Sequence, residues 1–406
     1  MNKNIKSIDR IEFLIYILLL ITPFFDTLNG ILIFYKIGFS IAILLKGLII
    51  TLTLLYLLMK KNLSIVFITI AFILLLGIKN LMQEDNLSIE FMWVIKIYFF
   101  MILFLFMKET INNNYKMVHI YFKILLVTII FNILGGFLFG YGFVAYEGTD
   151  LGSKGFYYAG NELGGVFISL SAYVAIILIN KKSTLKYIFG FVFLLFLSLL
   201  TTMKSSMLGT LLIFMAVPFI YAYINMKNLI MPRWIFYMIG IFIIILAILL
   251  PISFYYVYYV LALETRIGYA LNNASLISAI LSHRDVWAVQ MMDYFSENSS
   301  YYTVSFGYAY ETAFRLFGNR SEIDIVDIFF SYGFFGVVLV YGFWLNMLYR
   351  FIFLKTKLAG YILYAAILIF LVSFMSGHIL TTGIGAVPFA ILFSLAYLTR
   401  EKEEKL

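Results

Sequence analysis

Long apolar runs, broken by short polar or charged segments, fill most of this sequence. A helix that crosses a bilayer needs about 20 consecutive apolar residues, and the pattern therefore predicts an all-α polytopic membrane protein with about 12 transmembrane helices. The predicted spans lie near residues 11–33, 38–59, 63–80, 88–107, 117–140, 162–180, 187–203, 205–224, 234–256, 324–348, 358–376 and 379–398.

Two connections between these spans are too long to be simple turns, one near 141–161 and one near 256–323. Long loops in compact proteins usually carry function or are disordered, and we favour function for the second connection. The second connection alternates polar stretches with amphipathic ones, such as 285–295, so we expect it to be partly helical. No Pro-rich or Ser-rich linker and no clear internal repeat divides the chain, and we interpret residues 1–406 as a single membrane domain.

Composition restricts the class of protein. Of the 406 residues, 63% are hydrophobic and 12% are charged, and that charged share is about half of what a soluble domain carries. A soluble enzyme, a nucleic-acid-binding domain and a disordered scaffold are therefore excluded. The net charge of +8 does not indicate a nucleic-acid partner, because membrane proteins collect Lys and Arg on their cytoplasmic loops.

The positions of the basic residues predict the orientation of the chain. They gather at both termini and at the short connections opposite the two long ones, namely at Lys3, Lys6, Arg10, Lys60, Lys61, Lys181, Lys182, Lys186, Lys227, Arg233, Arg350, Lys355, Lys357 and Arg400. The positive-inside rule makes this side the cytoplasm. We expect both termini to be cytoplasmic and both long connections to be extracytoplasmic.

The sequence offers little that binds a metal. It has no cysteine, which excludes disulfides, Cys-built zinc sites and iron–sulfur clusters. Its three histidines, His119, His283 and His378, lie far apart in the sequence. We expect neither a metal nor a cofactor.

Two lysines lie inside predicted spans. Lys46 and Lys96 each lie about eight residues from the extracytoplasmic end, or roughly 12 Å deep at about 1.5 Å per residue. An ionisable residue in a membrane span is a functional hypothesis by default, and here we predict substrate binding. The alternative is that each lysine extends alone toward the membrane surface. Polar groups enter the spans mainly from this one side, which favours a site open to the outside over a transport path.

Three further residues on the same side are candidates for binding an anion. Lys154 lies in a glycine-rich turn shortly before a predicted helix start at Asn161, where backbone N–H groups and a cation can hold a phosphate. The alternative is a flexible turn followed by an Asn cap. Lys204 lies in a tight turn on the predicted extracytoplasmic side, where the positive-inside rule disfavours a lysine. This position indicates an anionic partner, although an ordinary exposed turn explains it as well.

The long connection and the following spans supply the candidate catalytic groups. Arg266 and Arg284 are isolated cations there, and arginine is suited to a bidentate grip on phosphate oxygens. A carboxylate among Glu322, Asp324 and Asp327 can act as a general base, although acids in a first helical turn also complement the helix dipole. His378, at the start of the last span, is either part of this site or a capping or packing residue.

These segments, in this order, resemble the O-antigen ligase and Wzy polymerase superfamily, most of all the capsule and exopolysaccharide polymerases of low-GC Gram-positive bacteria. The resemblance spans nearly the whole chain. It rests on Pro23 to Asp26, Asn29-Gly30, Lys154 to Glu162, Thr202 to Ser206, Ser282 to Asp285, Glu322 to Asp327, Tyr332-Gly333, Gly336 and Gly377-His378.

The resemblance implies a GT-C-like fold in the bacterial plasma membrane and metal-independent transfer of a glycan from an undecaprenyl-pyrophosphate carrier. Its partners would be lipid-linked glycans as donor and acceptor, membrane lipid, and flippase and chain-length regulator proteins. Arg266, Arg284, Lys204 and Lys154 would then bind the pyrophosphate. Asp324 or Glu322 would be the base, and Asp327 and His378 would support it.

One departure from the family pattern favours polymerisation over ligation. Ligases of the family commonly carry a histidine where the last loop meets its span, and here Glu322 and Asp324 occupy that region. Two alternatives stay open: a ligase that transfers finished glycan to a wall or lipid acceptor, and a flippase or transporter of lipid-linked glycans.

Overall fold

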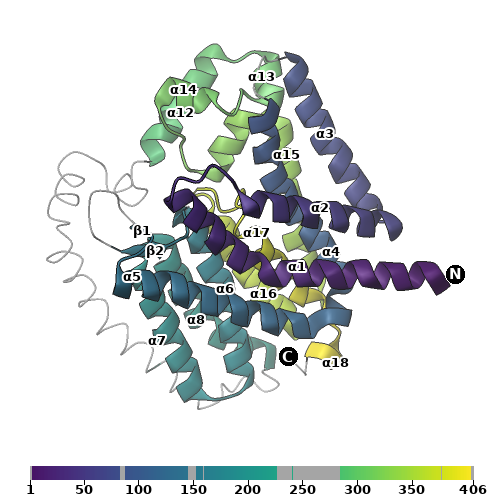
Figure 1. Ribbon diagram of the computed structural model, residues 1–406, viewed down its shortest axis with the longest axis vertical. Coiled ribbons are helices and arrows are strands. Elements are labelled where there is room, and N and C mark those ends of the chain that lie inside the picture. Colours follow the sequence, from purple (N-terminus) through teal and green to yellow (C-terminus); the bar gives the residue numbers. More distant parts are fainter. Residues whose placement is uncertain are drawn as a thin grey trace, which may run out of the picture.

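Helices make up almost all of the described structure (Figure 1). The computed structural model describes residues 2–82, 87–144, 152–158, 160–225, 240, 284–375 and 377–403. Among these residues, seven helices are long and apolar enough to cross a membrane, and three further apolar helices have 10–17 residues. The protein is therefore a multi-pass α-helical membrane protein.

The described elements follow one another along the chain as helices with a single small hairpin. The helices are α1 (Asn2–Phe34), α2 (Ile41–Met59), α3 (Leu63–Met82), α4 (Leu87–Ile129), a π-helical turn (Ile130–Gly135), α5 (Gly136–Phe139), α6 (Gly160–Asn180), α7 (Thr184–Leu200), α8 (Lys204–Asn225), α12 (Arg284–Asn298), α13 (Tyr301–Phe306), α14 (Thr312–Phe317), α15 (Asp324–Phe353), α16 (Lys357–Val372), α17 (Ala386–Ser394), a 3-10 turn (Leu395–Tyr397) and α18 (Arg400–Glu403). In the 141–161 connection, β1 (Phe143–Val144) pairs antiparallel with β2 (Ser153–Gly155).

Most predicted spans coincide with a helix to within a few residues. Two of them, 88–107 and 117–140, are not separated by a loop but joined in α4, which bends at Asn114 (φ −123°, ψ 24°). The last predicted span is shorter than expected, because the chain turns through residues 378–385 before α17 begins. The predicted span 234–256 lies outside the described residues apart from Gly240, so the total of about 12 spans stays a prediction, as does the GT-C-like fold.

Helix α6 lies at the centre of the bundle, where it packs against α7, α8, α16 and α17. Small residues allow the closest of these contacts, the one with α8. A Cβ on Gly164 would lie 2.2 Å from Ser205 Oγ, and one on Gly209 would lie 2.3 Å from a side-chain carbon of Ile168. Close approach through small residues is how membrane helices gain packing contacts in the absence of a hydrophobic driving force.

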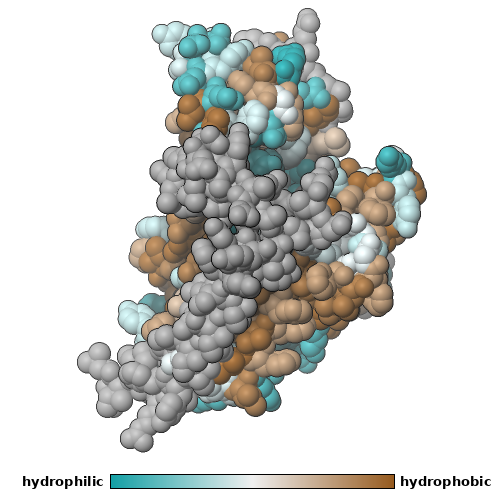
Figure 2. Space-filling view, turned by 90° about the vertical axis from the view of Figure 1, so that its left-hand side faces the viewer, coloured by the Kyte–Doolittle hydropathy of each residue, from teal (hydrophilic) through white to brown (hydrophobic). Residues whose placement is uncertain are grey.

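Helices α12, α13 and α14, with the segments that join them to α15, form a cap over one end of the bundle (residues 284–323; Figure 1). A small hydrophobic cluster of Met291, Phe295, Ala313 and Phe330 attaches this cap to α15. Hydrophilic residues are frequent at the top of the molecule, where the cap lies, and much of the surface below is hydrophobic (Figure 2). The prediction that the 256–323 connection is partly helical is confirmed for its described part.

A buried ion pair fixes the cap on the membrane helices. Lys79 of α3 is 2% exposed, and its Nζ donates to Glu90 of α4 at 3.0 Å and to the backbone oxygens of Tyr308 at 3.0 Å and Ser331 at 2.5 Å. Glu90 in turn accepts from the backbone N–H of Tyr310. Breaking a buried pair of this kind typically costs about 3–5 kcal/mol, so the position of the cap is strongly determined.

Buried polar groups also occur at the opposite end of the bundle, which the sequence pattern did not indicate. Glu12 is 7% exposed and accepts hydrogen bonds from Tyr56 at 2.8 Å and from Asn114 at 2.5 Å. Asn114 is the residue at which α4 bends. The polar groups therefore serve helix packing at that end as well, and their enrichment at the cap end is less one-sided than predicted.

Candidate active site

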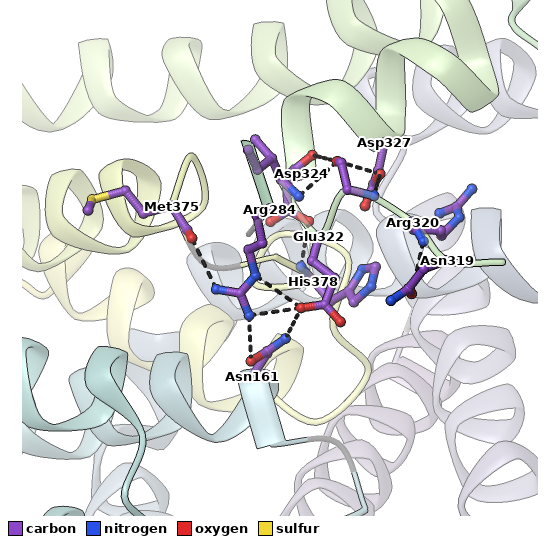
Figure 3. Close-up of polar contacts among 11 residues, drawn as sticks. Asn161, Arg284, Asn319, Arg320, Glu322, Asp324, Asp327, Met375 and His378 are labelled. Atoms are coloured by element: carbon purple, nitrogen blue, oxygen red, sulfur yellow. Dashed lines mark hydrogen bonds and ion pairs between the residues drawn. The ribbon is translucent and has the colours of Figure 1, made fainter. Parts of the chain in front are cut away.

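A carboxylate, a guanidinium and an amide meet where the cap joins the bundle (Figure 3). Glu322 lies just before α15, Arg284 begins α12, and Asn161 lies in the first turn of α6. Arg284 donates to Glu322 Oε2 from Nε at 3.0 Å and from Nη2 at 2.8 Å. Asn161 Nδ2 donates to the same oxygen at 3.0 Å, and its Oδ1 accepts from Arg284 Nη2 at 3.2 Å. Three segments far apart in the sequence thus form one polar cluster.

Only one carboxylate oxygen of Glu322 is engaged in this cluster. Within the part of the chain that the structure describes, all hydrogen bonds to its side chain reach Oε2, and the side chain is 34% exposed. The side chain of Arg284 is 17% exposed, and its Nη1 donates to the backbone oxygen of Met375 at 3.1 Å. A ligand can therefore approach Oε1 of Glu322 and the edge of the guanidinium.

Two residues of the site, Glu322 and His378, have backbone conformations that residues other than glycine seldom adopt. Glu322 and His378 have φ values of 55° and 61°, in the left-handed region that non-glycine residues seldom occupy. Gly377 allows their two segments to meet, because a Cβ there would lie 2.2 Å from the backbone oxygen of Glu322. Backbone strain of this kind concentrates at functional sites.

Asp324 holds the turn that carries His378. Its Oδ1 accepts from the backbone N–H of His378 at 2.8 Å, and its Oδ2 accepts from those of Ile379 at 3.0 Å and Leu380 at 2.9 Å. The side chain is 0% exposed. Both oxygens are thus occupied by backbone donors, and we interpret Asp324 as a positioning residue and Glu322 as the better placed of the two candidate bases.

Asp327 holds the segment that precedes Glu322. Its Oδ1 accepts from the backbone N–H of Ser321 at 3.2 Å and from the hydroxyl of the same residue at 2.8 Å, and the side chain is 4% exposed. The two aspartates therefore hold the two segments next to Glu322. Asp324 accepts hydrogen bonds from the 378–380 turn, and Asp327 accepts them from Ser321, which directly precedes Glu322.

His378 lies beside Trp93 of α4, with ring centroids 5.7 Å apart. Burial lowers the pKa of His378 from its ordinary value of about 6.5, although the negative charge of Asp327 opposes this effect. The imidazole is therefore neutral at neutral pH, where it can accept a proton or a hydrogen bond.

We expect the protein to lose thermal stability as the pH falls below about 6.5, partly because of His378. A group whose pKa is lower in the folded chain than in the unfolded chain binds a proton on unfolding. The stability that it contributes is therefore present above the unfolded pKa and is lost as the pH falls through the folded pKa. The measurement is the difference in melting temperature between about pH 7.5 and about pH 5.5, which is expected to be smaller in His378→Gln than in the wild type. An equal difference in both proteins would contradict this assignment.

Two carboxylates of the neighbouring spans are satisfied within the protein. Lys46 Nζ donates to Asp26 Oδ1 at 2.6 Å, and the two side chains are 17% and 7% exposed. Glu162 accepts from the Thr382 hydroxyl at 2.6 Å and from the backbone N–H of Ile384 at 3.2 Å. The charge of Lys46 is thus neutralised by an internal partner, whereas the sequence had suggested that it meets the substrate directly.

The other predicted cations in the described part of the chain have neighbours outside this cluster. Lys154 Nζ donates to the backbone oxygen of Tyr158 at 3.3 Å, and its side chain lies beside Gly160 at the start of α6. Lys204 is exposed at the start of α8, and the positive charge of Arg284 repels it. Lys96 Nζ lies 3.9 Å from the ring centroid of Trp93. Arg266 lies outside the described residues.

Sequence reasoning missed Trp93, Glu162 and Arg320 as neighbours of the site. Arg320 is 4% exposed and donates from Nη2 to Ser331 Oγ at 2.5 Å and to the backbone oxygen of Tyr310 at 3.3 Å. The criterion that selected Arg266 and Arg284, an isolated cation in the long connection, applies equally to Arg320. No comparable signal marks Trp93, whose place follows only from the packing of α4 against the cap.

The comparisons with known proteins found no match to a protein-family model, to a curated protein or to a solved structure. Within the described ranges, no group of three or more His, Asp or Glu side chains is placed to hold a metal ion.

Proposed function

We propose that this protein polymerises lipid-linked oligosaccharide repeat units at the outer face of a bacterial plasma membrane. The donor is the growing chain on undecaprenyl pyrophosphate, and the acceptor is a repeat unit on a second carrier. The observation that carries the proposal is the accessible Glu322–Arg284 pair, in which a possible base and a phosphate-binding group lie 2.8 Å apart at the cap end of the membrane helices.

The reaction is a displacement at the anomeric carbon of the donor. The acceptor hydroxyl oxygen forms a bond to that carbon, its proton passes to Glu322, and the bond to the pyrophosphate breaks with the electron pair on the leaving group. Negative charge grows on the pyrophosphate as the bond breaks. A fixed cation interacts more strongly with the transition state than with the bound donor, which is the condition for electrostatic catalysis.

Arg284 couples binding of the donor to activation of the base. Without substrate, its guanidinium occupies Glu322 Oε2. A pyrophosphate carries more negative charge and competes for the same donor groups, so its arrival draws Arg284 away from the carboxylate. Asn161 then remains to orient Glu322, whose oxygens become available to the acceptor hydroxyl. Lys204 and Lys154 add positive charge on the neighbouring ends of α8 and β2.

The test is chain elongation by the purified protein. Lipid-linked repeat units isolated from the source membrane are incubated with the protein in nanodiscs, and the products are separated by length. We expect longer lipid-linked oligosaccharides and one molecule of undecaprenyl pyrophosphate released for each bond formed. Unchanged single units would contradict the function, and transfer of the glycan to a different acceptor would indicate a ligase.

The proposed site requires the cap to face the outside of the cell. Because the chain has no cysteine, single cysteines report topology directly. Glu297 in the cap and Lys60 in the turn after α2 are both exposed. In intact cells, an impermeant thiol reagent is expected to label Glu297→Cys and to leave Lys60→Cys unlabelled until the membrane is opened. Labelling of Lys60→Cys alone, or of both before opening, would contradict the orientation.

A further inference from the structure

Four side chains from α4 and the cap form a continuous stack with a cation at each end. The Lys96 Nζ lies 3.9 Å from the ring centroid of Trp93. Trp93 stacks on Tyr310 with the centroids 4.1 Å apart and the planes at 24°. The guanidinium carbon of Arg320 lies 3.4 Å from the Tyr310 centroid. We call these four residues the aromatic stack.

Neither cation of the aromatic stack has a carboxylate partner among the described residues. Arg320 donates only to neutral oxygens, and its buried Nε has no hydrogen-bond partner there. Lys96 forms neither a hydrogen bond nor an ion pair with those residues, and its ammonium lies over the face of Trp93. The other lysines buried in neighbouring helices differ, because Lys46 pairs with Asp26 and Lys79 pairs with Glu90.

Lys96 is surrounded by charges of both signs. Glu162 attracts it, whereas Lys46 and Arg320 repel it. Glu162 is already bonded to Thr382 and to the 384 backbone, and Asp26 is already paired with Lys46. An unpaired cation in a membrane span is costly and marks a functional site by default. An incoming anion would therefore gain from Lys96, and it would meet no competing partner within the described residues.

The contacts of Trp93 connect Lys96 with the proposed active site. Side chains on a helix tilt toward its N-terminus, and Lys96 reaches back over Trp93 at the preceding turn of α4. Trp93 in turn borders His378, which is influenced electrostatically by Asp327, Arg320, Glu322 and Glu162. Lys96 is therefore connected to the proposed active site through Trp93 of α4, whereas Arg284 contacts Asn161 of α6 and Lys204 begins α8.

We propose that Lys96 binds the diphosphate of the second isoprenoid-linked substrate, the acceptor, while Arg284 and Lys204 bind that of the donor. This inference rests on the proposed function, which requires two carrier lipids to be bound at once. Two separate cationic positions would place the acceptor hydroxyl and the donor anomeric carbon at the same carboxylate. The aromatic stack holds Lys96 in place before the substrate arrives.

The test counts binding sites with a short probe, radiolabelled geranylgeranyl diphosphate, on the protein in nanodiscs. We expect two molecules bound by the wild type, one by Lys96→Gln, one by Arg284→Ala and none by the double variant. Lys36→Gln, at an exposed lysine before α2, is the matched control and is expected to bind two. Without probe, Lys96→Gln is expected to melt at the wild-type temperature or above it, because the substitution removes an unpaired charge.

Several outcomes would overturn the assignment. One bound molecule in the wild type, or two in Lys96→Gln, would exclude a site at Lys96. A clearly lower melting temperature for Lys96→Gln would show that the lysine is structural. Equal competition by inorganic pyrophosphate would contradict the isoprenoid-linked ligand. If the wild type lengthens glycans but binds one probe molecule, this inference fails and the proposed function stands, whereas two bound molecules without elongation would contradict the proposed function.

Discussion

Replacing Glu322 by glutamine is expected to stop chain elongation while leaving the protein folded. Glutamine keeps a side-chain oxygen that can accept the hydrogen bonds of Arg284 and Asn161, but it cannot take a proton from the acceptor hydroxyl. A positioned general base contributes typically about 10²–10⁴-fold to a rate, and we expect a loss of that size in the elongation assay with purified protein.

Two controls make the Glu322→Gln result specific. Glu311→Gln, at an exposed carboxylate of the same cap, is expected to elongate chains at the wild-type rate. Asp324→Asn is expected to lower the melting temperature, because an amide cannot accept all of the backbone hydrogen bonds that Asp324 accepts. An elongation rate of Glu322→Gln close to that of the wild type would exclude Glu322 as the base.

Replacing Arg284 by alanine is expected to lower the elongation rate by about 10²–10³-fold, the usual effect of removing one donor that stabilises a transition-state charge. Thermal stability should change little, because Arg284 and Glu322 are both partly exposed and a pair of this kind contributes only about 0–1 kcal/mol. Arg284→Lys should recover little activity. A lysine ammonium cannot replace a guanidinium that donates from Nε, Nη1 and Nη2 to three different residues.

The products of Arg284→Ala distinguish the candidate functions. A defective polymerase leaves carrier lipid with single repeat units at the outer face. A defective transporter leaves these units facing the cytoplasm, and a defective ligase leaves long chains on the carrier. Arg315→Ala, at an exposed arginine of α14, is the matched control and should produce normal polymer. Normal polymer from a well-expressed Arg284→Ala protein would refute the assignment.

Sequence alone was sufficient to place most of the described membrane helices. An apolar run of the length of a bilayer has to satisfy its backbone hydrogen bonds internally, which makes it helical whatever its neighbours are. For this reason α2, α3 and α6 begin and end within a few residues of their predicted bounds. The bend at Asn114 and the turn before α17 were not predicted, because both depend on contacts with distant segments, such as the hydrogen bond of Asn114 to Glu12 and the contacts of Asp324 with the 378–380 turn.

The candidate site was only partly accessible to sequence reasoning. The ionisable residues of the site could be selected from the sequence because charged residues are uncommon in a chain that is 63% hydrophobic. The same criterion could not tell which of Asp324 and Glu322 is the better candidate base, because the two lie two residues apart and differ only in burial and in their hydrogen-bond donors. It also could not show that Lys46 has a carboxylate partner and that Lys96 has none among the described residues.

The sequence by itself therefore determined that this is a multi-pass helical membrane protein with a limited set of charged groups. The tertiary structure alone decided which of these groups meet: Arg284 with Glu322 and Asn161, and Asp324 with a backbone turn. The physical reason is the range of the forces. Helix formation depends on hydrogen bonds within four residues, whereas the function of a charge depends on its burial and its partners. Here the partners come from distant segments, 38 residues apart for Arg284 and Glu322 and 54 residues apart for Asp324 and His378.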